Sequence, residues 1–266
     1  MTAVRRFYRI DFRGTPRHVI EEDGSSRLLE GDLFGDCEPG DTIAPKDHRL
    51  LAPVAPSKIV AIGLNYKDHA AEQGKALPQE PMMFMKPSTA VIGPEDAIVL
   101  PEGAGRVDHE AEVGVVIGRR AVRVSEEAAR DYILGLTCLN DVTARELQKK
   151  DVQYTRAKGF DTFAPIGPCI AAGLDYGAAE GITVEGWVNG TRRQSSTTKE
   201  LVFSIDRLVA FVTAVMTLLP GDIIATGTPA GIGPLAAGDR VTVKVGGVGE
   251  LTNPVAAAAR SRGAGT

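Results

Sequence analysis

The sequence has few cysteines and few histidines, and this scarcity narrows the chemistry available to the protein. Its 266 residues include three cysteines and four histidines. Cys37, Cys138 and Cys169 lie far apart and form no CxxC pair. The pattern therefore predicts neither a cysteine-type zinc site nor a disulfide framework. It favours a reduced, cytoplasmic setting in which the cysteines serve as small buried hydrophobic residues.

The chain also lacks a strong charge of one sign and a long apolar run. Its formal net charge is −4 at pH 7, so no electrostatic footprint for nucleic acid is present. The longest apolar segment, residues 208–219, is too short to span a bilayer, and charged residues interrupt the N-terminus where a secretory signal would need apolar ones. We expect no membrane partner, and we predict a buried helix capped by Ser204 for this segment.

Turn-forming residues, by contrast, are abundant, with 30 Gly and 16 Pro. Alternating or short apolar segments predict strands at 58–64, 106–118, 133–139, 223–226 and 240–245, and a hairpin over 182–194 that turns at Asn189-Gly190. Helices are expected at 65–74 with Asn65 as cap, at 125–132 with Ser125 as cap, and at 144–150. We therefore predict a mainly β fold with a few helices (α+β), shaped as a roll or barrel and not as a doubly wound parallel sheet.

A proline-containing stretch at 51–57 divides the chain. Residues 1–54 carry short alternating segments and turn signals, which indicate a small β-rich N-terminal domain. The candidate catalytic residues all follow it, in a predicted catalytic domain over 55–256. The tail from Ala256 is small and polar without a pattern, and we expect it to fray.

Four carboxylates stand out from the rest of the sequence. Asp108, Glu110 and Glu112 are two residues apart in a predicted strand and would share one face. Asp141 ends an apolar strand, where a lone charge needs a partner. One interpretation is a solvated edge strand. The other is an oxygen site for Mg²⁺, Mn²⁺ or Ca²⁺ built from these carboxylates, because the set contains no His or Cys ligand.

Six stretches of the chain resemble, in the same order, motifs of the fumarylacetoacetate hydrolase family. They are residues 62–72, 84–89, 108–118, 140–145, 156–165 and 225–233. The resemblance spans about residues 58–250 and implies a β-roll core, a divalent cation, with Mg²⁺ as the first assignment, and a homodimer. It also implies that Glu110, Glu112 and Asp141 bind the metal. At Gly159 the chain departs from the Ser that many members carry.

The resemblance also implies roles for three further side chains. His69 and Glu72 are three residues apart on one face of a predicted helix, and in the family this pair activates water from a mobile lid over the metal. Lys158 would lie beside the metal and stabilise an enolate oxygen. From the residues alone, ordinary solvated side chains are the favoured interpretation for all three, because most charged and polar residues face solvent.

Two more pairs are candidates for holding the substrate. Arg145 and Gln148 share a helix face after Asp141 and could bind a substrate carboxylate, or simply face solvent. Gly227 and Thr228 lie in a Gly-rich turn that matches no nucleotide-binding loop. They could donate hydrogen bonds to the same carboxylate, or form a simple tight turn.

The function implied by the resemblance is hydrolysis of a carbon–carbon bond in a small 2-oxo acid of the acylpyruvate type, through a metal-stabilised pyruvate enolate. The family also contains 2-hydroxyhepta-2,4-diene-1,7-dioate isomerases of aromatic catabolism and oxaloacetate decarboxylases, which need the same enolate. A non-catalytic metal-binding protein of the same fold is the alternative from another class. Loops 74–81 and 194–199 are candidates for the pocket at the substrate's other end.

Overall fold

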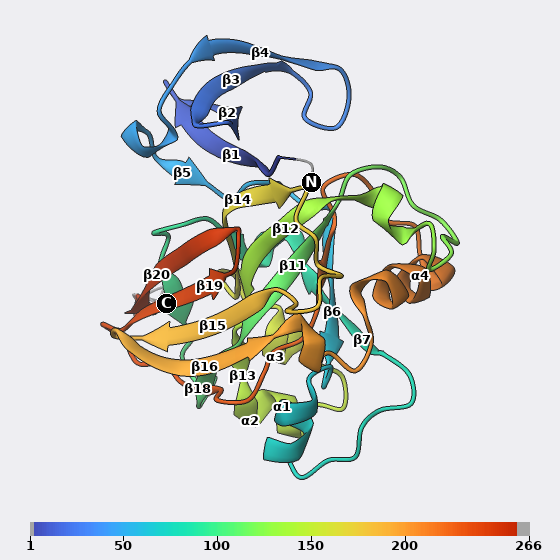
Figure 1. Ribbon diagram of the computed structural model, residues 1–266. Helices are drawn as coiled ribbons and strands as arrows, with labels where there is room; N and C mark the ends of the chain where they lie inside the picture. The colour runs from blue at the N-terminus through green and yellow to red at the C-terminus, as the bar shows by residue number, and fades with distance from the viewer. Residues whose placement is uncertain (1–2, 260–266) are drawn as a thin grey trace, which may run out of the picture.

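The computed structural model describes residues 3–259, and strands dominate it (Figure 1). The strands are β1 (Arg5–Phe12), β2 (Thr15–Glu22), β3 (Ser25–Gly31), β4 (Cys37–Thr42), β5 (Leu50–Leu51), β6 (Lys58–Gly63), β7 (Met82–Pro87), β8 (Val91–Ile92), β9 (Ile98–Leu100), β10 (Val107–His109), β11 (Ala111–Ile117), β12 (Ile133–Asn140), β13 (Thr143–Ala144), β14 (Ala164–Ala172), β15 (Thr183–Val188), β16 (Thr191–Thr197), β17 (Ile223–Ala225), β18 (Gly233–Pro234), β19 (Arg240–Val245) and β20 (Gly249–Ala257). The α-helices are α1 (Lys67–Glu72), α2 (Arg145–Lys150), α3 (Thr155–Lys158) and α4 (Ile205–Val215).

These strands form three sheets. The largest has 12 strands in the order β4-β3-β2-β1-β14-β12-β11-β17-β6-β7, with β5 beside β1 and β8 beside β14. A five-stranded sheet has the order β16-β15-β19-β20-β9, and a three-stranded sheet the order β13-β10-β18. Most pairings are antiparallel, whereas β6 with β17, β8 with β14 and β9 with β20 are parallel. The predicted mainly β fold with a few helices is confirmed.

The N-terminal strands β1 to β4 form an antiparallel meander that extends the largest sheet (Figure 1). The connection is made by β1, which pairs with β14 from Arg5 opposite Ala172 to Phe7 opposite Ile170. The meander has its own apolar cluster, formed by Ile10, Val19 and Leu28. Backbone hydrogen bonds therefore continue from this small β-rich part into the sheet that carries the candidate site.

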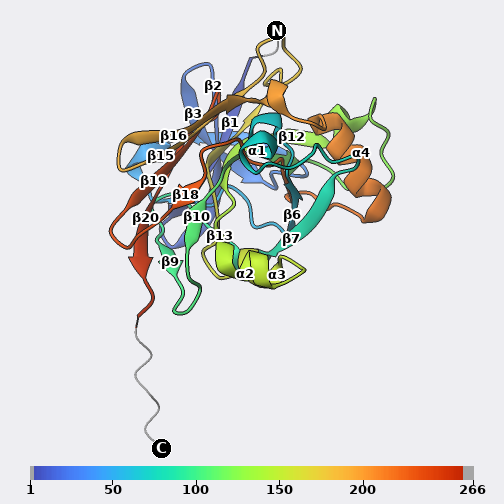
Figure 2. The ribbon, with the colours of Figure 1, turned by 90° about the horizontal axis from the view of Figure 1, so that it is seen from below.

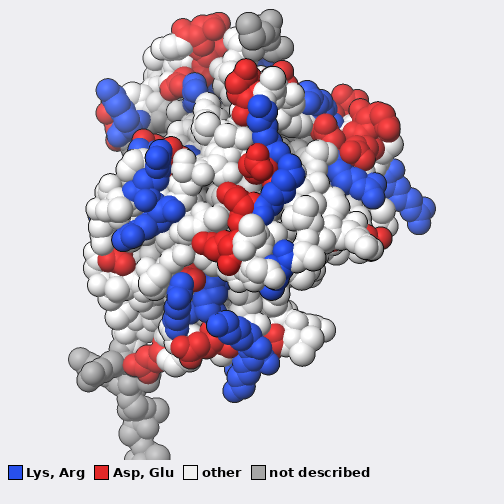
Figure 3. All heavy atoms as spheres, turned by 60° about the horizontal axis from the view of Figure 1, so that its bottom comes forward, with Lys and Arg blue, Asp and Glu red and all other residues white. Residues whose placement is uncertain are grey.

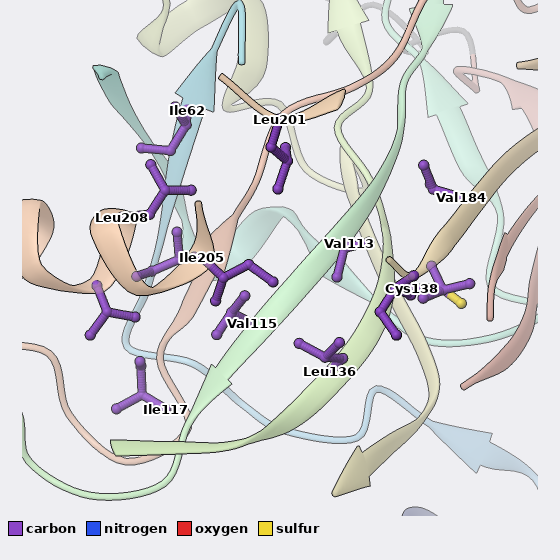
Figure 4. Close-up of a cluster of buried hydrophobic side chains, with 14 of the residues drawn as sticks. Ile62, Val113, Val115, Ile117, Leu136, Cys138, Val184, Leu201, Ile205 and Leu208 are labelled. Carbon is purple, nitrogen blue, oxygen red and sulfur yellow. The ribbon is translucent and has the colours of Figure 1, made fainter. Parts of the chain in front are cut away.

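The main core lies between the central strands and α4 (Figure 4). Val113 and Val115 of β11 face this core, and Ile205 and Leu208 of α4 pack from the other side. The side chain of Ser204 accepts a hydrogen bond from the Arg207 amide at 3.2 Å, which confirms the predicted cap. Among the described residues, no helix is long and apolar enough to cross a membrane.

Three local predictions are wrong. Asn65 does not cap α1, because its side chain instead bonds to the backbone of Phe203 and Thr226. The helix expected at 125–132 is reduced to a 3₁₀ turn at Ala129–Tyr132. The strand expected at 106–118 breaks at Glu110, so that β10 and β11 belong to different sheets.

Two minor expectations have mixed outcomes. Ala256 and Ala257 complete β20 instead of fraying, and residues 260–266 of the predicted tail lie outside the described residues. Cys138 and Cys169 are buried as expected, whereas Cys37 is only partly buried; all three are free.

Asp222, just before β17, joins Ser57 and Lys58 at the start of β6 to the buried core through hydrogen bonds. It is fully buried and accepts hydrogen bonds from Ser57, Lys58 and the Leu219 amide, and its carboxylate lies 2.5 Å from the Lys58 ammonium. Burial opposes ionisation, but these donors outweigh it and lower the pKa of Asp222.

We expect Asp222→Ala to lower the free energy of unfolding by about 3 kcal/mol, because removing one partner of a buried ion pair leaves the remaining donors without an acceptor. Urea denaturation measures the change. Asp161→Ala, at an exposed position, is the control and should shift stability by less than about 0.5 kcal/mol. Equal stability of the two variants would contradict the assignment.

Candidate active site

A cavity of about 240 Å³ opens where the central strands meet α1, α2 and α3. Seen from below, α1 lies on one side of this region and α2 and α3 on the other (Figure 2). Strand β6 leads directly into α1, and β12 leads through β13 into α2, so the rigid sheet places both helices at the rim. The lining includes Glu110, Glu112, Asp141, Lys158 and His69.

The three predicted metal ligands lie together at the floor of this cavity. Glu112 is on β11, Glu110 precedes it at the strand break, and Asp141 follows β12. The Asp141 amide donates to the Glu110 carbonyl at 2.9 Å, and the Glu110 amide donates to the Asn140 side chain at 2.9 Å. One carboxylate oxygen of each acid lies within 4.8 Å of the others, and all three residues are buried. The backbone pairing of β11 with β12 therefore fixes the cluster.

The electrostatics of the cluster fit a divalent cation. Burial, together with Asp141 and Glu110, raises the pKa of Glu112 well above its ordinary value. Burial also opposes ionisation of Glu110, but Lys158 and Arg145 outweigh it and lower that pKa. A dication beside Glu112 would supply the counter-charge that this carboxylate needs. Oxygen ligands of this kind suit Mg²⁺, Mn²⁺ or Ca²⁺.

Two buried lysines flank Asp141. Lys158, at the end of α3, donates to Glu110 Oε2 at 2.8 Å and to Asp141 Oδ2 at 2.5 Å. Lys86, on β7, donates to Asp141 Oδ1 at 2.5 Å and to the Val142 carbonyl at 3.2 Å. Burial lowers the pKa of Lys86, whereas for Lys158 the two carboxylates outweigh burial and raise the pKa. Sequence reasoning missed Lys86; the available signal was a lysine directly after the apolar run 82–85.

His69 and Glu72 lie on one face of α1 and contact each other. His69 Nδ1 is 3.0 Å from Glu72 Oε2. A carboxylate accepts, so Nδ1 carries the proton and Nε2 keeps a lone pair. Glu72 Oε1 accepts the Gly231 amide at 2.9 Å. Gly231 has a φ of 97°, and a Cβ there would lie 2.1 Å from the Arg193 carbonyl oxygen, so this contact requires glycine.

Arg145 and Gln148 lie on α2 at the rim, and Arg145 is bonded to protein acceptors. Its guanidinium donates to Asp108 Oδ2 at 2.8 Å, to Glu110 Oε1 at 2.5 Å and to Gln148 Oε1 at 2.9 Å. Asp108, beyond the strand break, is held by Arg145 and also by Arg106. In this arrangement Arg145 orients Glu110, and the amide nitrogen of Gln148 makes no hydrogen bond to another residue of the described range 3–259. Binding of substrate by the two residues stays a prediction.

Gly227 and Thr228 have their hydrogen-bond donors engaged by the protein. The Gly227 amide donates to Glu112 Oε2 at 2.9 Å. The Thr228 hydroxyl donates to the Ala111 carbonyl at 2.9 Å and accepts from Gln194 Nε2 at 2.8 Å. To bind a substrate carboxylate as predicted, either group would have to release its present acceptor. As placed, they orient Glu112 and hold the turn against β11.

His109, on β10, is a buried histidine that sequence reasoning passed over. Its Nδ1 lies 3.1 Å from Gln194 Oε1, so Nδ1 donates. Its Nε2 has no hydrogen-bond partner among the described residues. Burial lowers the pKa of His109, although Gln194 and Asp108 act in the opposite direction.

We expect this histidine to make the protein less stable at mildly acidic pH. The unfolded chain binds the proton first, because the ordinary pKa of 6.5 is higher than that of His109 in the folded chain. The free energy of unfolding should therefore fall as the pH drops below about 6.5, by at most about 1.4 kcal/mol per pH unit, until the folded-state pKa is reached.

Urea denaturation at several pH values checks this expectation. His109→Leu should show a shallower loss of stability between neutral and acidic pH than the wild type. His48→Leu, at a partly buried position, is the control and should keep the wild-type dependence. The same pH dependence in the His109 variant and the wild type would refute this role of His109.

Family models and a full-length relative both match most of the chain. The family model described as Fumarylacetoacetate (FAA) hydrolase C-terminal matches residues 58–256, and the one described as Rv2993c-like, N-terminal, matches residues 5–53. The chain is 43% identical over 260 residues to a 2,4-didehydro-3-deoxy-L-rhamnonate hydrolase of Sphingomonas sp. (strain SKA58), covering 92% of this chain and 91% of that protein.

Two solved structures are similar over nearly their whole length. A 2-hydroxyhepta-2,4-diene-1,7-dioate isomerase from Mycobacterium marinum has 40% sequence identity and a TM-score of 0.87, covering 96% of this chain and 99% of that one. A maleylpyruvate hydrolase from Sphingobium sp. SYK-6, in complex with manganese(II) ion and pyruvate, has 30% identity and a TM-score of 0.80, covering 96% of this chain and 100% of that one.

Proposed function

Because the chain belongs to the fumarylacetoacetate hydrolase family, we propose that it hydrolyses a carbon–carbon bond of an acylpyruvate-type 2-oxo acid with the help of a divalent cation. One observation carries the proposal. A single cavity of about 240 Å³ is lined by three buried carboxylates, by Lys158 and by His69, which is bonded to Glu72. The products would be pyruvate and a carboxylic acid.

Glu110, Glu112 and Asp141 would hold the cation through their carboxylate oxygens. When bound, it would act as a Lewis acid toward the 2-oxo group and offset the charge of the substrate carboxylate. Mg²⁺ is our first assignment, because carboxylate oxygens without His or Cys ligands suit it. Mn²⁺ is the alternative, supported by the manganese(II) ion in the similar maleylpyruvate hydrolase structure.

Lys158 would stabilise the negative charge that develops as the bond breaks. Two of its three N–H groups donate to Glu110 and Asp141, which leaves one for a ligand. The electron pair of the broken bond passes to the three-carbon fragment as an enolate, and a fixed ammonium group in a water-poor site stabilises that charge strongly. Protonation of the enolate at C3 then gives pyruvate.

His69 and Glu72 would activate the attacking water. Because Nδ1 donates to Glu72, Nε2 can accept the proton of a water molecule, and the carboxylate stabilises the imidazolium that results. The oxygen of that water would bond to the carbonyl carbon remote from the 2-oxo acid. The carbon–carbon bond between this carbon and the three-carbon fragment would then break, and the acyl part would leave as a carboxylic acid. The proton held by His69 balances the one taken up by the enolate.

A dienoate isomerase is the second candidate, favoured by the similar isomerase structure. It would need the same enolate stabilisation but no water. Incubation with acetylpyruvate, fumarylpyruvate and oxaloacetate, with pyruvate measured, separates the reactions. We expect pyruvate from at least one acylpyruvate. Pyruvate from oxaloacetate alone would identify a decarboxylase, and isomerisation of 2-hydroxyhepta-2,4-diene-1,7-dioate without pyruvate from any substrate would replace the hydrolase proposal.

A non-catalytic metal-binding protein is the alternative from a different class. The joint presence of the carboxylates, Lys158 and His69 in one cavity, with Glu72 bonded to His69, argues for catalysis. Removal of the metal with a chelator should abolish turnover, and added Mg²⁺ or Mn²⁺ should restore it. Turnover that is unchanged by the chelator would contradict the proposed metal dependence.

We also propose a homodimer of this 28.1 kDa chain. β7 is the last strand of the largest sheet, and Met82 and Met85 on it are 40% and 49% exposed. Val152, at the same surface hollow, is 99% exposed. Apolar side chains grouped in this way favour contact with a second copy. Light scattering should give twice the chain mass, and a monomeric mass at micromolar concentration would contradict the proposal.

A further inference from the structure

One buried amide outside the cavity lining is bonded to several parts of the candidate active site. Gln194, on β16, is 1% exposed, and it is not among the described residues that line the catalytic cavity. On the face of the molecule that Figure 3 shows, charged side chains of both signs are interspersed at the surface, where water solvates them. A buried amide, by contrast, costs free energy unless its polar atoms find partners in the protein. The partners of Gln194 therefore indicate its role.

The amide oxygen of Gln194 binds the residues on either side of Glu110. Oε1 accepts the Ala111 amide at 2.9 Å and lies 3.1 Å from His109 Nδ1. A backbone N–H can only donate, so the contact with Ala111 fixes which atom of the side-chain amide is the oxygen. His109 ends β10 and Ala111 begins β11, the two strands that separate at Glu110. Gln194 thus holds both sides of the strand break that carries this carboxylate.

The amide nitrogen of Gln194 holds the turn at residues 226–231. Nε2 donates to Thr228 Oγ1 and to the Pro229 carbonyl, both at 2.8 Å. The two N–H groups and the two lone pairs of the amide are then all engaged. Because β16 belongs to the five-stranded sheet and β17, just before the turn, to the largest one, the amide joins two sheets.

The two ends of this turn bind carboxylates of the candidate site. The Gly227 amide donates to Glu112 Oε2 at 2.9 Å, and the Gly231 amide donates to Glu72 Oε1 at 2.9 Å. Both donors are backbone groups, so their positions depend on the path of the turn. A side chain that holds the turn therefore also places Glu112 and the carboxylate that is bonded to His69.

Two glycines make room for the Gln194 side chain. Gly186, on β15, is its partner in the strand register, and a Cβ there would lie 2.7 Å from Gln194 Oε1 and 3.2 Å from the Ala111 Cβ. A Cβ at Gly231 would lie 3.3 Å from Gln194 Cγ. The backbone of two segments thus packs closely against this side chain, which restricts the amide to one orientation.

We propose that Gln194 is a positioning residue that sets the geometry of the candidate metal ligands and of the His69–Glu72 pair together, although its own hydrogen bonds go to other residues. It acts through the backbone beside Glu110 and through the turn 226–231. The inference rests on the proposed function for the roles of these groups. Because one amide supports both, its loss should disturb cation binding and the docking of α1 at the same time.

The affinity for Mg²⁺ tests the first effect without any turnover. Gln194→Met keeps the length of the side chain and removes its four hydrogen bonds. Calorimetry should show roughly 10- to 100-fold weaker binding of Mg²⁺, the range expected for partners that orient metal ligands. Asn253→Leu is the matched control, because Asn253 is an equally buried amide on the same sheet and donates to the carbonyls of Gly93 and Asp96. It should lower stability and keep the wild-type affinity.

Amide hydrogen exchange over residues 67–75 tests the second effect. At saturating Mg²⁺ this segment should exchange faster in Gln194→Met than in the wild type or in Asn253→Leu. Glu72→Ala should also speed exchange, since it removes the acceptor of the Gly231 amide. Adding Gln194→Met to Glu72→Ala should then raise the exchange rate little further, because both changes break one connection.

Both effects are required. Wild-type Mg²⁺ affinity or wild-type exchange in a folded Gln194→Met protein would overturn the inference. If that variant does not fold, Thr228→Val, which removes the hydroxyl that accepts from Nε2, decides in its place. The affinity should fall and the exchange of residues 67–75 should rise in Thr228→Val, and unchanged values would overturn the inference.

The two proposals fail in different ways. If no acylpyruvate is hydrolysed but Gln194→Met weakens Mg²⁺ binding and speeds exchange in α1, the reaction is wrong and the positioning role stands. If an acylpyruvate is hydrolysed and Gln194→Met keeps the wild-type kcat, Mg²⁺ affinity and exchange, the hydrolase proposal stands and this inference falls.

Discussion

Glu110→Gln is expected to lower turnover by more than about 10²-fold, because even outer partners of metal ligands are worth 10–100-fold. The change removes one charge while keeping the shape of the side chain. It also weakens the contacts of Glu110 with Lys158 and Arg145, which both depend on its negative charge. The fold should persist, because glutamine keeps the size of the side chain and its amide oxygen can still accept a hydrogen bond from Lys158 or Arg145.

Three measurements on one preparation test this expectation. Calorimetry should show weaker Mg²⁺ or Mn²⁺ binding, the pyruvate assay should show the loss of turnover, and circular dichroism should match the wild type. Glu102→Gln, at an exposed position, is the matched control and should behave as the wild type in all three. Full Mg²⁺-dependent turnover by the Glu110 variant would refute its assignment as a ligand.

His69→Ala should lower hydrolysis by roughly 10²–10⁴-fold, the usual contribution of a positioned general base. Any decarboxylation of oxaloacetate by the same protein should fall far less, because that reaction needs enolate stabilisation and no activated water. Both reactions would still require Lys158. We expect His69→Ala to affect mainly hydrolysis because Glu72 fixes the tautomer of His69 and leaves Nε2 to accept the proton of a water molecule.

Measuring both rates on one preparation cancels errors in the fraction of active protein. Glu72→Gln should also reduce hydrolysis, since a neutral amide stabilises an imidazolium less well than a carboxylate does. If His69→Ala lowers hydrolysis and decarboxylation by equal factors, His69 does not activate water. It would then position the substrate or hold α1 in place.

The sequence predicted the carboxylate cluster better than it predicted the strand that carries part of it. The acids at 110, 112 and 141 come together because β11 and β12 are neighbours, as strands that follow one another in the sequence commonly are. The break at Glu110 was not predictable, because it arises where the Asn140 side chain binds the Glu110 amide. That bond joins positions 30 residues apart, and a residue pattern does not report it.

The same limit explains the other misses. Asn65 is a good helix cap by residue type, but its amide bonds to Phe203 and Thr226 from distant segments of the chain. Lys86 ends an apolar strand, and its burial becomes intelligible only once Asp141 is placed beside it. Residue type and periodicity report local preference, whereas these contacts depend on the folded arrangement of separate segments.

The two carboxylate oxygens of Glu72 link the orientation of His69 to the position of α1. One oxygen holds His69 in the tautomer that can take a proton, and the other holds α1 to the Gly231 amide. Because His69 and Glu72 both belong to α1, lifting of α1 would break the Gly231 contact and carry the intact pair away from the three carboxylates. The base would then leave the site as one unit with its partner, so a water molecule in the open site would have no oriented base beside it.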